Sequence, residues 1–576
     1  MSGAAPAALL TALRAAVGAR HVLTGEAATH RFRTGYRFGG GPVAAVVRPG
    51  SLVELWRVAQ AVVDAGAILI CQASNTGLTG GSTPDGADYD RPVVLVSTLR
   101  IAGVHLVRGG EQVVCLPGAT LDALEKTLAP LGREPHSVIG SSCIGASVLG
   151  GVCNNSGGAL VRRGPAFTEL ALYARVAADG RLELVNHLGI ELGATPEEIL
   201  TRLERGAFDA ADVRDTASPA SDRDYAAHVR EVDAATPARF NADPRKLFEA
   251  SGSAGHVVLF AARLDTFPRA AGTTVFYVGC NAPADLTRVR RAMLGGDLPL
   301  PIAAEYIHRD AFVLTERYGR DTFLAIRYLG TARLPALFRW KDRVDGWFRR
   351  LGLRHVADRA MQAATRPGPS HLPRRLTAYR DRFEHHLMLR VDAADADATE
   401  ALLARALGDR GEDDGGEGGE REGGGAFFRC TPAEGDAAFT HRFAVAGAAV
   451  RYRAVHARAV ADIVALDIAL RRNDADWFET LPADLDAAIA HRFYYGHFFC
   501  HVFHQDYVIR KGYDPLAVEH RMWALLDARG AEYPAEHNVG HLYKAKPALT
   551  DHYRGLDPTN SFNPGVGQTS KRAHWR

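Results

Sequence analysis

The sequence predicts an α+β protein built from several domains, and three observations lead to this prediction. The chain has 576 residues, enough for about three or four domains of roughly 150 residues each. Its composition, 47% hydrophobic and 23% charged, is that of an ordinary globular protein with sizeable buried cores. Short apolar runs alternate with helical stretches from Val43 to about Phe267, a pattern typical of mixed α and β structure.

The individual elements follow from local patterns. Apolar runs of four or five residues, rich in β-branched side chains, predict strands, and longer amphipathic stretches predict helices. The predicted strands are Val43–Val47, Ile68–Cys71, Val93–Val96 and Val113–Leu116, and the predicted helices are Leu52–Ala65 and Leu121–Ala129. A new unit begins at residue 268, with a strand at Thr274–Val278 and a helix near Leu286–Leu294.

Two loops rich in glycine, serine and asparagine, Ala73–Ser82 and Gly140–Gly158, are the most informative local feature. The first follows the predicted strand Ile68–Cys71. Crowded backbone N–H groups and small polar side chains suit the binding of a pyrophosphate without a lysine. Neither loop matches Gly-x4-Gly-Lys-Ser/Thr or Gly-x-Gly-x-x-Gly, and either loop alone is equally compatible with a tight turn.

A second concentration of functional side chains lies near the C-terminus. It comprises His497, His504, Glu536 and His537, with His501 and His541 nearby. A single histidine is more often a packed or hydrogen-bonded residue than a metal ligand. Six histidine and glutamate residues within about forty-five positions, however, favour a functional site. Two imidazoles and a carboxylate are suitable ligands for Zn²⁺ or Mn²⁺. The cluster alone is also compatible with a metal-dependent hydrolase.

Charge, cysteine content and hydropathy exclude several classes of protein. The net charge is only +2, so the whole molecule shows no attraction to a polyanion. Seven cysteines without a Cys-x-x-Cys pair argue for reduced thiols and against a disulfide framework. We find no signal-peptide pattern at the N-terminus and no apolar run of the roughly 18 residues that a membrane span needs. The expectation is a soluble or peripheral protein.

The segment Arg333–Arg382 differs in character from the rest of the chain. It holds thirteen Lys and Arg against four Asp and Glu, interleaved with aromatic and leucine side chains. Such a segment suits an anionic membrane surface, and a solvated helical face is the plainer alternative. Nucleic acid is not expected, because no binding motif accompanies the charge. Residues 411–425, rich in Gly and Glu, predict a flexible loop without a function.

Taken together, the two loops resemble the FAD-binding domain of the vanillyl-alcohol oxidase or p-cresol methylhydroxylase type. Four segments make the resemblance closer, and the chain resembles the respiratory, quinone-dependent D-lactate dehydrogenases of bacteria. These segments are residues 132–147, 236–244, 495–497 and 535–541. The resemblance extends from Leu52 to the Asn563–Gly565 region.

This resemblance implies a segmented layout of a two-part FAD-binding domain, an inserted α+β cap domain and a small basic membrane-binding subdomain. The FAD-binding domain comprises residues 1–267 and 524–576. The cap comprises 268–308, 385–427 and 455–523, and the membrane-binding subdomain comprises 309–384 and 428–454.

The resemblance also implies which residues hold a non-covalently bound FAD. In the first loop these are Ala73, Ser74, Asn75, Thr76, Gly77, Gly81 and Ser82. In the second loop they are Gly140, Ser147 and Gly157, and Leu259 contributes its backbone from a later strand.

For the C-terminal cluster, the resemblance implies His537 as the general base and His497, His504 and Glu536 as ligands of a divalent metal, Zn or Mn. An imidazole is suited to take the C2 hydroxyl proton of D-lactate near neutral pH. The stretch Phe498–Phe503 departs from the Gly-Asp-Gly-Asn-Leu of related enzymes, which puts the metal in question. Arg380 and Arg382 are candidates for binding the substrate carboxylate, with a solvated surface as the alternative.

The implied function is oxidation of D-lactate to pyruvate, with electrons passed to ubiquinone or menaquinone. The implied location is the cytoplasmic face of the bacterial inner membrane, where the protein is bound peripherally. The alternatives are a related D-2-hydroxyacid dehydrogenase with another acid or a soluble acceptor, the hydrolase considered above, and a catalytically silent flavin-binding adaptor.

Overall fold

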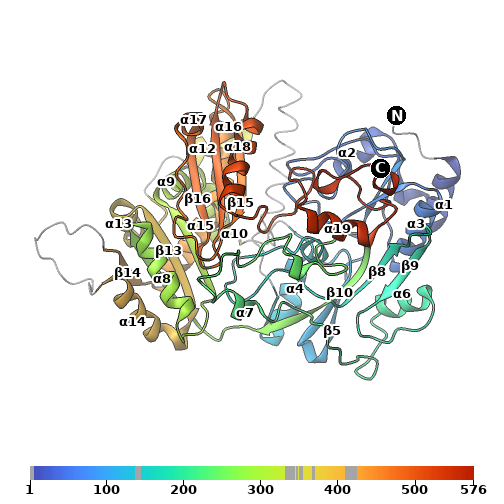
Figure 1. The fold of residues 1–576 in the computed structure, drawn as a ribbon, viewed down its shortest axis with the longest axis horizontal. Coiled ribbons are helices and arrows are strands. Elements are labelled where there is room, and N and C mark those ends of the chain that lie inside the picture. The colour runs from blue at the N-terminus through green and yellow to red at the C-terminus, as the bar shows by residue number, and fades with distance from the viewer. Residues whose placement is uncertain are drawn as a thin grey trace, which may run out of the picture.

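Three separate β-sheets organise the chain into two lobes (Figure 1). The computed structural model describes residues 6–136, 145–330, 344, 348, 355–365, 370–408 and 424–576. One lobe contains the N-terminal part of the chain, and both marked chain ends lie on it. The other lobe contains the middle of the chain. Gly140, nearly half of the basic segment Arg333–Arg382 and most of residues 411–425 lie outside the described residues.

The first sheet has the strand order β1-β2-β4-β3, in which β2, β4 and β3 are parallel. Helices α1 and α3 pack beside it, and Ser51 caps α3 by accepting a hydrogen bond from the Glu54 N–H. The predicted strands and helix of this region are confirmed with small shifts at their ends. The elements are β1 (Val22–Leu23), β2 (Ala45–Val47), β3 (Ile68–Gln72), β4 (Val93–Ser97), α1 (Ala7–Val17), α2 (Glu26–Arg33) and α3 (Leu52–Asp64).

The second sheet is antiparallel, with the order β5-β6-β10-β8-β9 and β7 beside β10. Its strands are β5 (Val104–Val107), β6 (Gln112–Cys115), β7 (Arg133–Pro135), β8 (Ala171–Val176), β9 (Leu182–Asn186) and β10 (Val258–Pro268). Its helices are α4 (Leu121–Leu128), α5 (Val148–Cys153), α6 (Pro196–Glu204) and α7 (Tyr225–His228). The predicted strand Val113–Leu116 and helix Leu121–Ala129 are thereby confirmed.

The third sheet is a seven-stranded antiparallel sheet with the order β14-β11-β13-β12-β16-β17-β15. Strands from widely separated parts of the sequence therefore lie side by side, which brings distant residues into register. The strands are β11 (Thr273–Cys280), β12 (Ala303–His308), β13 (His385–Asp392), β14 (Ala426–Arg429), β15 (Val460–Ala469), β16 (Ile489–His497) and β17 (Val502–Arg510).

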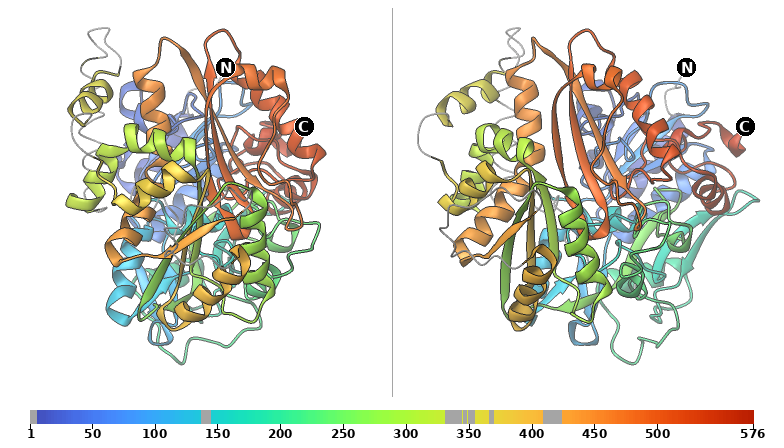
Figure 2. Two further views of the ribbon diagram at one scale, coloured as in Figure 1. Left: turned by 90° about the vertical axis from the view of Figure 1, so that its left-hand side faces the viewer. Right: turned by 60° about the vertical axis from the view of Figure 1, so that its left-hand side comes forward.

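Helices cover both faces of this sheet, as Figures 1 and 2 show. One face packs against α8 (Pro283–Gly295) and α14 (Ala396–Leu407) in the largest hydrophobic core. The other face packs against a group that we call the helical cover. Its members are α9 (Arg309–Tyr318), α10 (Arg320–Leu329), α12 (Val356–Thr365), α13 (Arg374–Arg382), α15 (Pro432–Phe443) and α16 (Val445–Val455). Two further helices, α17 (Ala483–Ala488) and α18 (Pro515–Ala528), follow β15 and β17 along the chain.

After α18 the chain returns to the N-terminal lobe. Helix α19 (Pro547–Leu556) lies on that lobe, and the following segment runs beside β3. There the Leu69 N–H donates to the Ser561 carbonyl at 3.0 Å, and the Asn563 N–H donates to the Leu69 carbonyl at 3.0 Å. The last part of the chain is thus built into the sheet that precedes the first glycine-rich loop.

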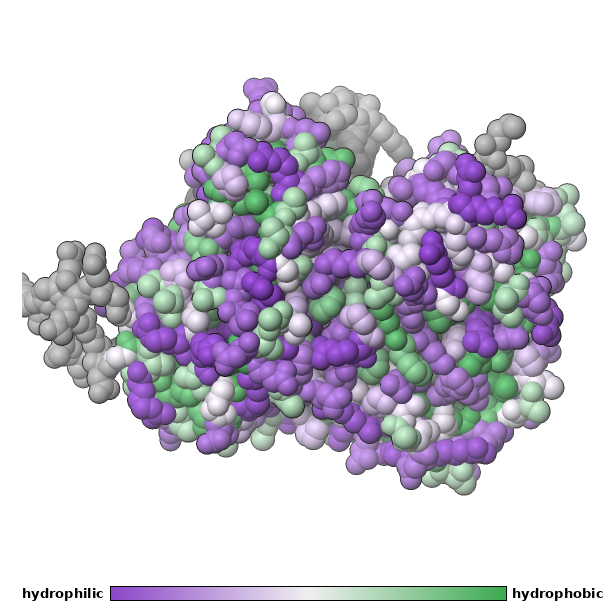
Figure 3. Space-filling model, viewed as in Figure 1, coloured by the Kyte–Doolittle hydropathy of each residue, from purple (hydrophilic) through white to green (hydrophobic). Residues whose placement is uncertain are grey.

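The lengths of the helices and the polarity of the surface are relevant to the expected membrane association. None of the helices in the described part of the chain is long and apolar enough to span a bilayer. On the face shown in Figure 3, hydrophobic residues form small groups among hydrophilic ones. The six cysteines among the described residues are all unpaired, in agreement with the expectation of free thiols.

A buried carboxyl on α18 makes the stability of the fold dependent on pH. Glu519 is 8% exposed, and burial raises its pKa from 4.5 to about 7. Because the folded-state pKa lies above the unfolded one, the free energy of unfolding falls as pH rises from 4.5 to 7. We expect Glu519→Gln to stabilise the protein by up to about 3 kcal/mol at pH 8 and to have no effect near pH 4. Urea unfolding at both pH values measures this, with exposed Glu111→Gln as the control; equal effects at both would contradict it.

Candidate active site

Four neighbouring strands of the third sheet line up four titratable side chains. The strands β12, β16, β17 and β15 are adjacent in that order. Glu305 is directly opposite His497, and Asp467 is directly opposite His504. His497 faces Val502 across the hairpin, so His504, two residues further along β17, is its diagonal neighbour on the same face. The register of the sheet therefore places a row of Glu, His, His and Asp across it.

The hairpin between the two histidines is the region where the sequence departs from related enzymes. Phe498–Cys500 form a short 3-10 turn whose side chains are buried in the core beside Trp477. His501 ends this turn in the left-handed region, with φ of 51°. The altered residues therefore fill the core while the register keeps His497 and His504 together, with 3.4 Å between their Nε2 atoms.

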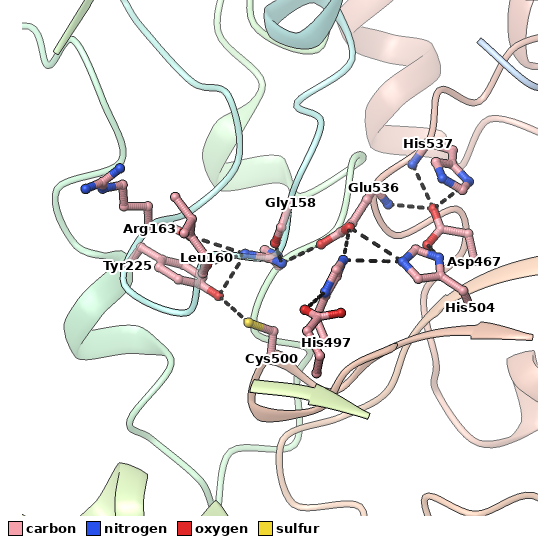
Figure 4. Close-up of polar contacts among 12 residues, drawn as sticks. Gly158, Leu160, Arg163, Tyr225, Asp467, His497, Cys500, His504, Glu536 and His537 are labelled. Carbon is pink, nitrogen blue, oxygen red and sulfur yellow. Dashed lines mark hydrogen bonds and ion pairs between the residues drawn. The ribbon is translucent and has the colours of Figure 1, made fainter. Parts of the chain in front are cut away.

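The returning C-terminal segment adds a carboxylate to this pair of imidazoles (Figure 4). Glu536 Oε2 lies 3.1 Å from His497 Nε2 and 3.9 Å from His504 Nε2. The other ring nitrogens face carboxylates, since His497 Nδ1 lies 2.6 Å from Glu305 and His504 Nδ1 lies 3.3 Å from Asp467. Two Nε2 atoms and one carboxylate oxygen thus converge, and each imidazole is oriented from behind by an acid. This is the outer-shell arrangement typical of metal-binding histidines.

The charges of this cluster shift the affinities of its members for protons. Burial lowers the pKa of His497, but Glu305 and Glu536 outweigh that effect and raise the pKa to about 10. Burial raises the pKa of Glu536, but His497 and Arg239 outweigh it and lower the pKa to about 2. Burial lowers the pKa of His504 despite the Asp467 carboxylate. The cluster can therefore hold a proton on His497 between two carboxylates, or a cation in place of that proton.

Asp467 joins the cluster to His537. Its Oδ2 atom accepts hydrogen bonds from the backbone N–H groups of Glu536 and His537, both at 2.7 Å. His537 Nδ1 lies 3.5 Å from the same oxygen, and its ring stacks on His504 with 5.4 Å between centroids. The His537 side chain is 41% exposed, whereas that of Asp467 is 2% exposed. His537 is therefore the accessible imidazole of the cluster.

His501 and His541 have structural hydrogen bonds and do not join the cluster. His501 Nδ1 lies 2.9 Å from the Arg471 carbonyl. The two ring nitrogens of His541 lie 3.1 Å from the Gly565 carbonyl and 2.8 Å from the Thr83 carbonyl. Their proximity in the sequence to His504 and His537 does not translate into a shared site.

The first glycine-rich loop, Ala73–Ser82, begins where β3 ends and folds against the same C-terminal segment. At its base, Gln72 donates a hydrogen bond to the Ser82 carbonyl at 2.8 Å. The Cβ of a side chain at Gly77 would lie 3.0 Å from Asn538 Nδ2, so the loop packs tightly against Asn538 at this position. Asn75 has a positive φ of 53°, and its side chain donates to the Thr34 carbonyl.

The second loop contacts the cluster from the other direction. Ser147 caps α5 by accepting the Gly150 N–H at 3.2 Å. A Cβ at Gly157 would lie 2.5 Å from Glu536 Oε1, so this glycine allows Glu536 to pack against the loop. Leu259 lies on β10 opposite Tyr173 of β8, next to a shift in register. Gly77 and Gly81 of the first loop and Gly157 of the second therefore border the segment that carries Glu536 and His537.

The surroundings of the second loop fit a large polar cofactor such as FAD. Several buried polar atoms there have no hydrogen-bond partner in the part of the chain that the structure describes. These atoms are Ser253 Oγ, Asn155 Oδ1 and the two ring nitrogens of His136. Buried polar groups are normally paired, so these atoms are suited to meet polar groups of a cofactor held between the two loops.

Sequence reasoning missed three residues of the site. Glu305 and Asp467 lie on strands far from the histidines in the sequence, and only the pairing of strands shows their role. Arg239, 2% exposed, contacts Glu536 from a segment between the lobes. The sequence did point to Arg239, because this residue lies in the 236–244 segment that supports the family resemblance. Arg380, a candidate for binding the substrate carboxylate, instead pairs with Glu316 and Asp381 on the helical cover.

Comparisons with known proteins place the whole chain beside one family of enzymes. Residues 275–575 match a family model described as D-lactate dehydrogenase, membrane binding. The chain is 52% identical over 573 residues to the quinone-dependent D-lactate dehydrogenase of Haemophilus influenzae, covering 98% of this chain and 99% of that protein. It is 53% identical over 571 residues to the enzyme of the same name from Escherichia coli, covering 99% and 98%. For the enzyme of that name from Corynebacterium glutamicum the identity is 48%, with coverage of 98% and 97%.

Solved structures support the expected fold class. p-Cresol methylhydroxylase has a TM-score of 0.56 at 10% identity, covering 97% of this chain and 96% of that chain. 4-Ethylphenol oxidase from Gulosibacter chungangensis has a TM-score of 0.55 at 12% identity, covering 97% and 96%. At this level of identity the likeness concerns the fold, which confirms the prediction of a p-cresol methylhydroxylase-type architecture.

Proposed function

The chain belongs to the family of quinone-dependent D-lactate dehydrogenases, and we propose that it oxidises D-lactate to pyruvate with FAD as its cofactor and a membrane quinone as electron acceptor. High identity over the whole chain carries this proposal. The contacts of the first glycine-rich loop with Asn538 and of the second with Glu536 support it independently. The hydrolase alternative has no support, since it leaves both loops unexplained.

The proposed reaction removes two electrons and two protons from the substrate. His537 accepts the proton of the C2 hydroxyl, because it is the exposed imidazole of the cluster and its Nδ1 faces the buried Asp467 carboxylate. Asp467 in turn keeps the backbone of the Glu536–His537 pair in place through two N–H hydrogen bonds. FAD, when bound, supplies the acceptor for the C2 hydrogen and its electron pair.

We further propose that His497, His504 and Glu536 hold a divalent cation, Zn or Mn. The three donor atoms lie within 4.8 Å of one another. Both imidazoles are oriented by carboxylates, Glu305 for His497 and Asp467 for His504. Such a cation would supply a Lewis acid beside the substrate hydroxyl.

The helical cover is the proposed membrane-docking surface. Five of the exposed large apolar side chains lie on it: Val313, Tyr328, Leu329, Phe443 and Val450, of which Tyr328 is 74% exposed. Exposed arginines, among them Arg317 and Arg327, accompany them. Apolar side chains beside cations suit an anionic bilayer surface, and a peripheral position on the cytoplasmic face of the inner membrane would give access to quinone. Arg339, Lys341, Arg343, Arg349 and Arg350 of the basic segment lie outside the described residues.

The central test is flavin reduction under anaerobic conditions. We expect the purified protein to show flavin absorption that bleaches with D-lactate and not with L-lactate. His537→Ala should retain flavin and lose at least about 100-fold in the reduction rate, because general-base catalysis contributes about that much or more. His520→Ala, an exposed histidine on α18, is the control. A rapid reduction in the His537 variant would remove that residue from the mechanism, and unbleached wild-type flavin would redirect the search to other D-2-hydroxyacids.

The metal proposal is tested by metal content. We expect about one Zn or Mn per chain after incubation with either ion and gel filtration, measured by mass spectrometry. His504→Ala should lose most of this metal, because two ligands bind far more weakly than three, whereas His491→Ala on the same hairpin should keep it. Equal metal content in wild type and the His504 variant would contradict the site.

Membrane binding is tested by co-sedimentation with vesicles. We expect the wild type to bind vesicles that contain anionic lipid and to bind neutral vesicles several-fold less. The double variant Tyr328→Ser/Val450→Ser should bind anionic vesicles several-fold less than wild type, because each buried apolar side chain contributes to interfacial binding. Leu106→Ser, at an exposed leucine of the N-terminal lobe, is the control. Undiminished binding by the double variant would move the docking surface elsewhere.

A further inference from the structure

One segment between the two lobes takes no part in the proposed chemistry, yet it contacts both halves of the site. Residues 236–243, which we call the strap, follow α7 and precede a short turn at Pro244–Lys246. The strap is fixed at its start by Arg472, which lies just after β15. The Arg472 backbone N–H and Nε both donate to the Thr236 carbonyl, at 3.1 and 3.0 Å, and Nη2 donates to the Thr236 hydroxyl at 2.8 Å.

Arg239, in the middle of the strap, joins the second glycine-rich loop to Glu536. Its guanidinium donates to the carbonyls of Gly158, Leu160 and Arg163, the last two at 3.2 Å. The same group forms an ion pair with Glu536 Oε1 and donates to Tyr225 Oη at 3.4 Å. Figure 4 shows Gly158, Leu160 and Tyr225 on one side of this network and Glu536 on the other. Both partners of the ion pair are buried, with side chains 2% and 5% exposed.

Asn241 binds His537, the residue that follows Glu536. Its side-chain amide donates to the His537 carbonyl, while its own carbonyl accepts from Asn155 Nδ2 at 3.3 Å. Asn155 lies in the second glycine-rich loop. The strap thus holds the side chain of Glu536 through Arg239 and the backbone of His537 through Asn241.

We propose that Arg239 and Asn241 are positioning residues, which fix the Glu536–His537 pair relative to the second glycine-rich loop and therefore relative to the flavin. The inference rests on the proposed function, because the distance that it concerns is the one between the base and the cofactor. Both residues are buried, Arg239 with 2% and Asn241 with 3% of its surface exposed. Their role is to fix the positions of Glu536 and His537.

The geometry of arginine explains why this residue type suits the strap. A planar guanidinium with five donors can bind carbonyls on one edge and a carboxylate on another in fixed directions. Lysine offers a single flexible ammonium group, which can keep the charge near Glu536 but cannot bind the Gly158 carbonyl of the loop and the Leu160 and Arg163 carbonyls after it in fixed directions. An error of about 1 Å between reacting groups can cost about 100-fold in rate. A positioning role therefore predicts different losses for lysine and for an uncharged residue.

The experiment measures the rate constant of flavin reduction by D-lactate at saturation and the apparent Kd for D-lactate, by anaerobic stopped flow on the holoenzyme. We compare wild type, Arg239→Lys, Arg239→Met and Asn241→Leu. Arg263→Lys is the matched control, since Arg263 is also 2% exposed and bonds Gln112 and the carbonyls of Leu188 and Gly189, away from the site. Flavin content and the unfolding midpoint are recorded for each variant.

We expect Arg239→Met to lower the reduction rate by about 100-fold and Arg239→Lys and Asn241→Leu by about 10-fold each, with little change in the apparent Kd. Arg263→Lys should lower the unfolding midpoint without changing the rate. If Arg239→Met does not fold, the other two variants carry the test. Wild-type reduction rates in flavin-loaded Arg239→Lys and Asn241→Leu would overturn the inference. A wild type that is not reduced by D-lactate would instead overturn the proposed function.

Discussion

The site depends on one buried carboxylate, that of Asp467. It lies on an edge strand of the seven-stranded sheet, and the returning C-terminal segment is attached to it by two N–H groups that share a single oxygen. An ionised carboxylate in the interior is costly unless it is paired and hydrogen-bonded. His504 and His537 and these two N–H groups satisfy that need, and His537 and His504 help to hold the pKa of Asp467 well below its usual range although burial acts to raise it. The attachment of the C-terminal segment to this sheet and the position of the His537 backbone therefore have the same cause.

The charges around Asp467 balance over a short distance. Three carboxylates, those of Glu305, Asp467 and Glu536, are buried in the cluster. Two arginines compensate them, since Arg442 lies 2.9 Å from Glu305 and Arg239 pairs with Glu536. The histidines lie between these ion pairs. Because each acid has a cation or a donor of its own, the imidazoles keep fixed orientations, which a group of freely solvated side chains would not have.

Much of the fold and part of the site could be predicted from the sequence. Strands such as Val93–Ser97 show as continuous apolar runs, helices such as Leu52–Asp64 show an amphipathic period, and the loop Ala73–Ser82 shows its glycines. His497, His504, Glu536 and His537 lie close enough together in the sequence to be seen as one group. Glu305 and Asp467 could not be found this way, because each reaches the histidines through pairing between strands that are far apart in the sequence. For the same reason the sequence could not show that Arg239 pairs with Glu536, although residues 236–244 are one of the segments that carry the family resemblance.

The course of the chain has a consequence for its synthesis on the ribosome. The first glycine-rich loop is translated early, whereas Asn538, which it contacts, and the segment that runs beside Leu69 are translated much later. The exit tunnel still encloses these last residues when the first loop has long been outside it. The nascent chain must therefore keep its N-terminal sheet without the Ser561–Asn563 partner until those residues have left the tunnel. A chain that stops before residue 536 has both loops but lacks Glu536 and His537.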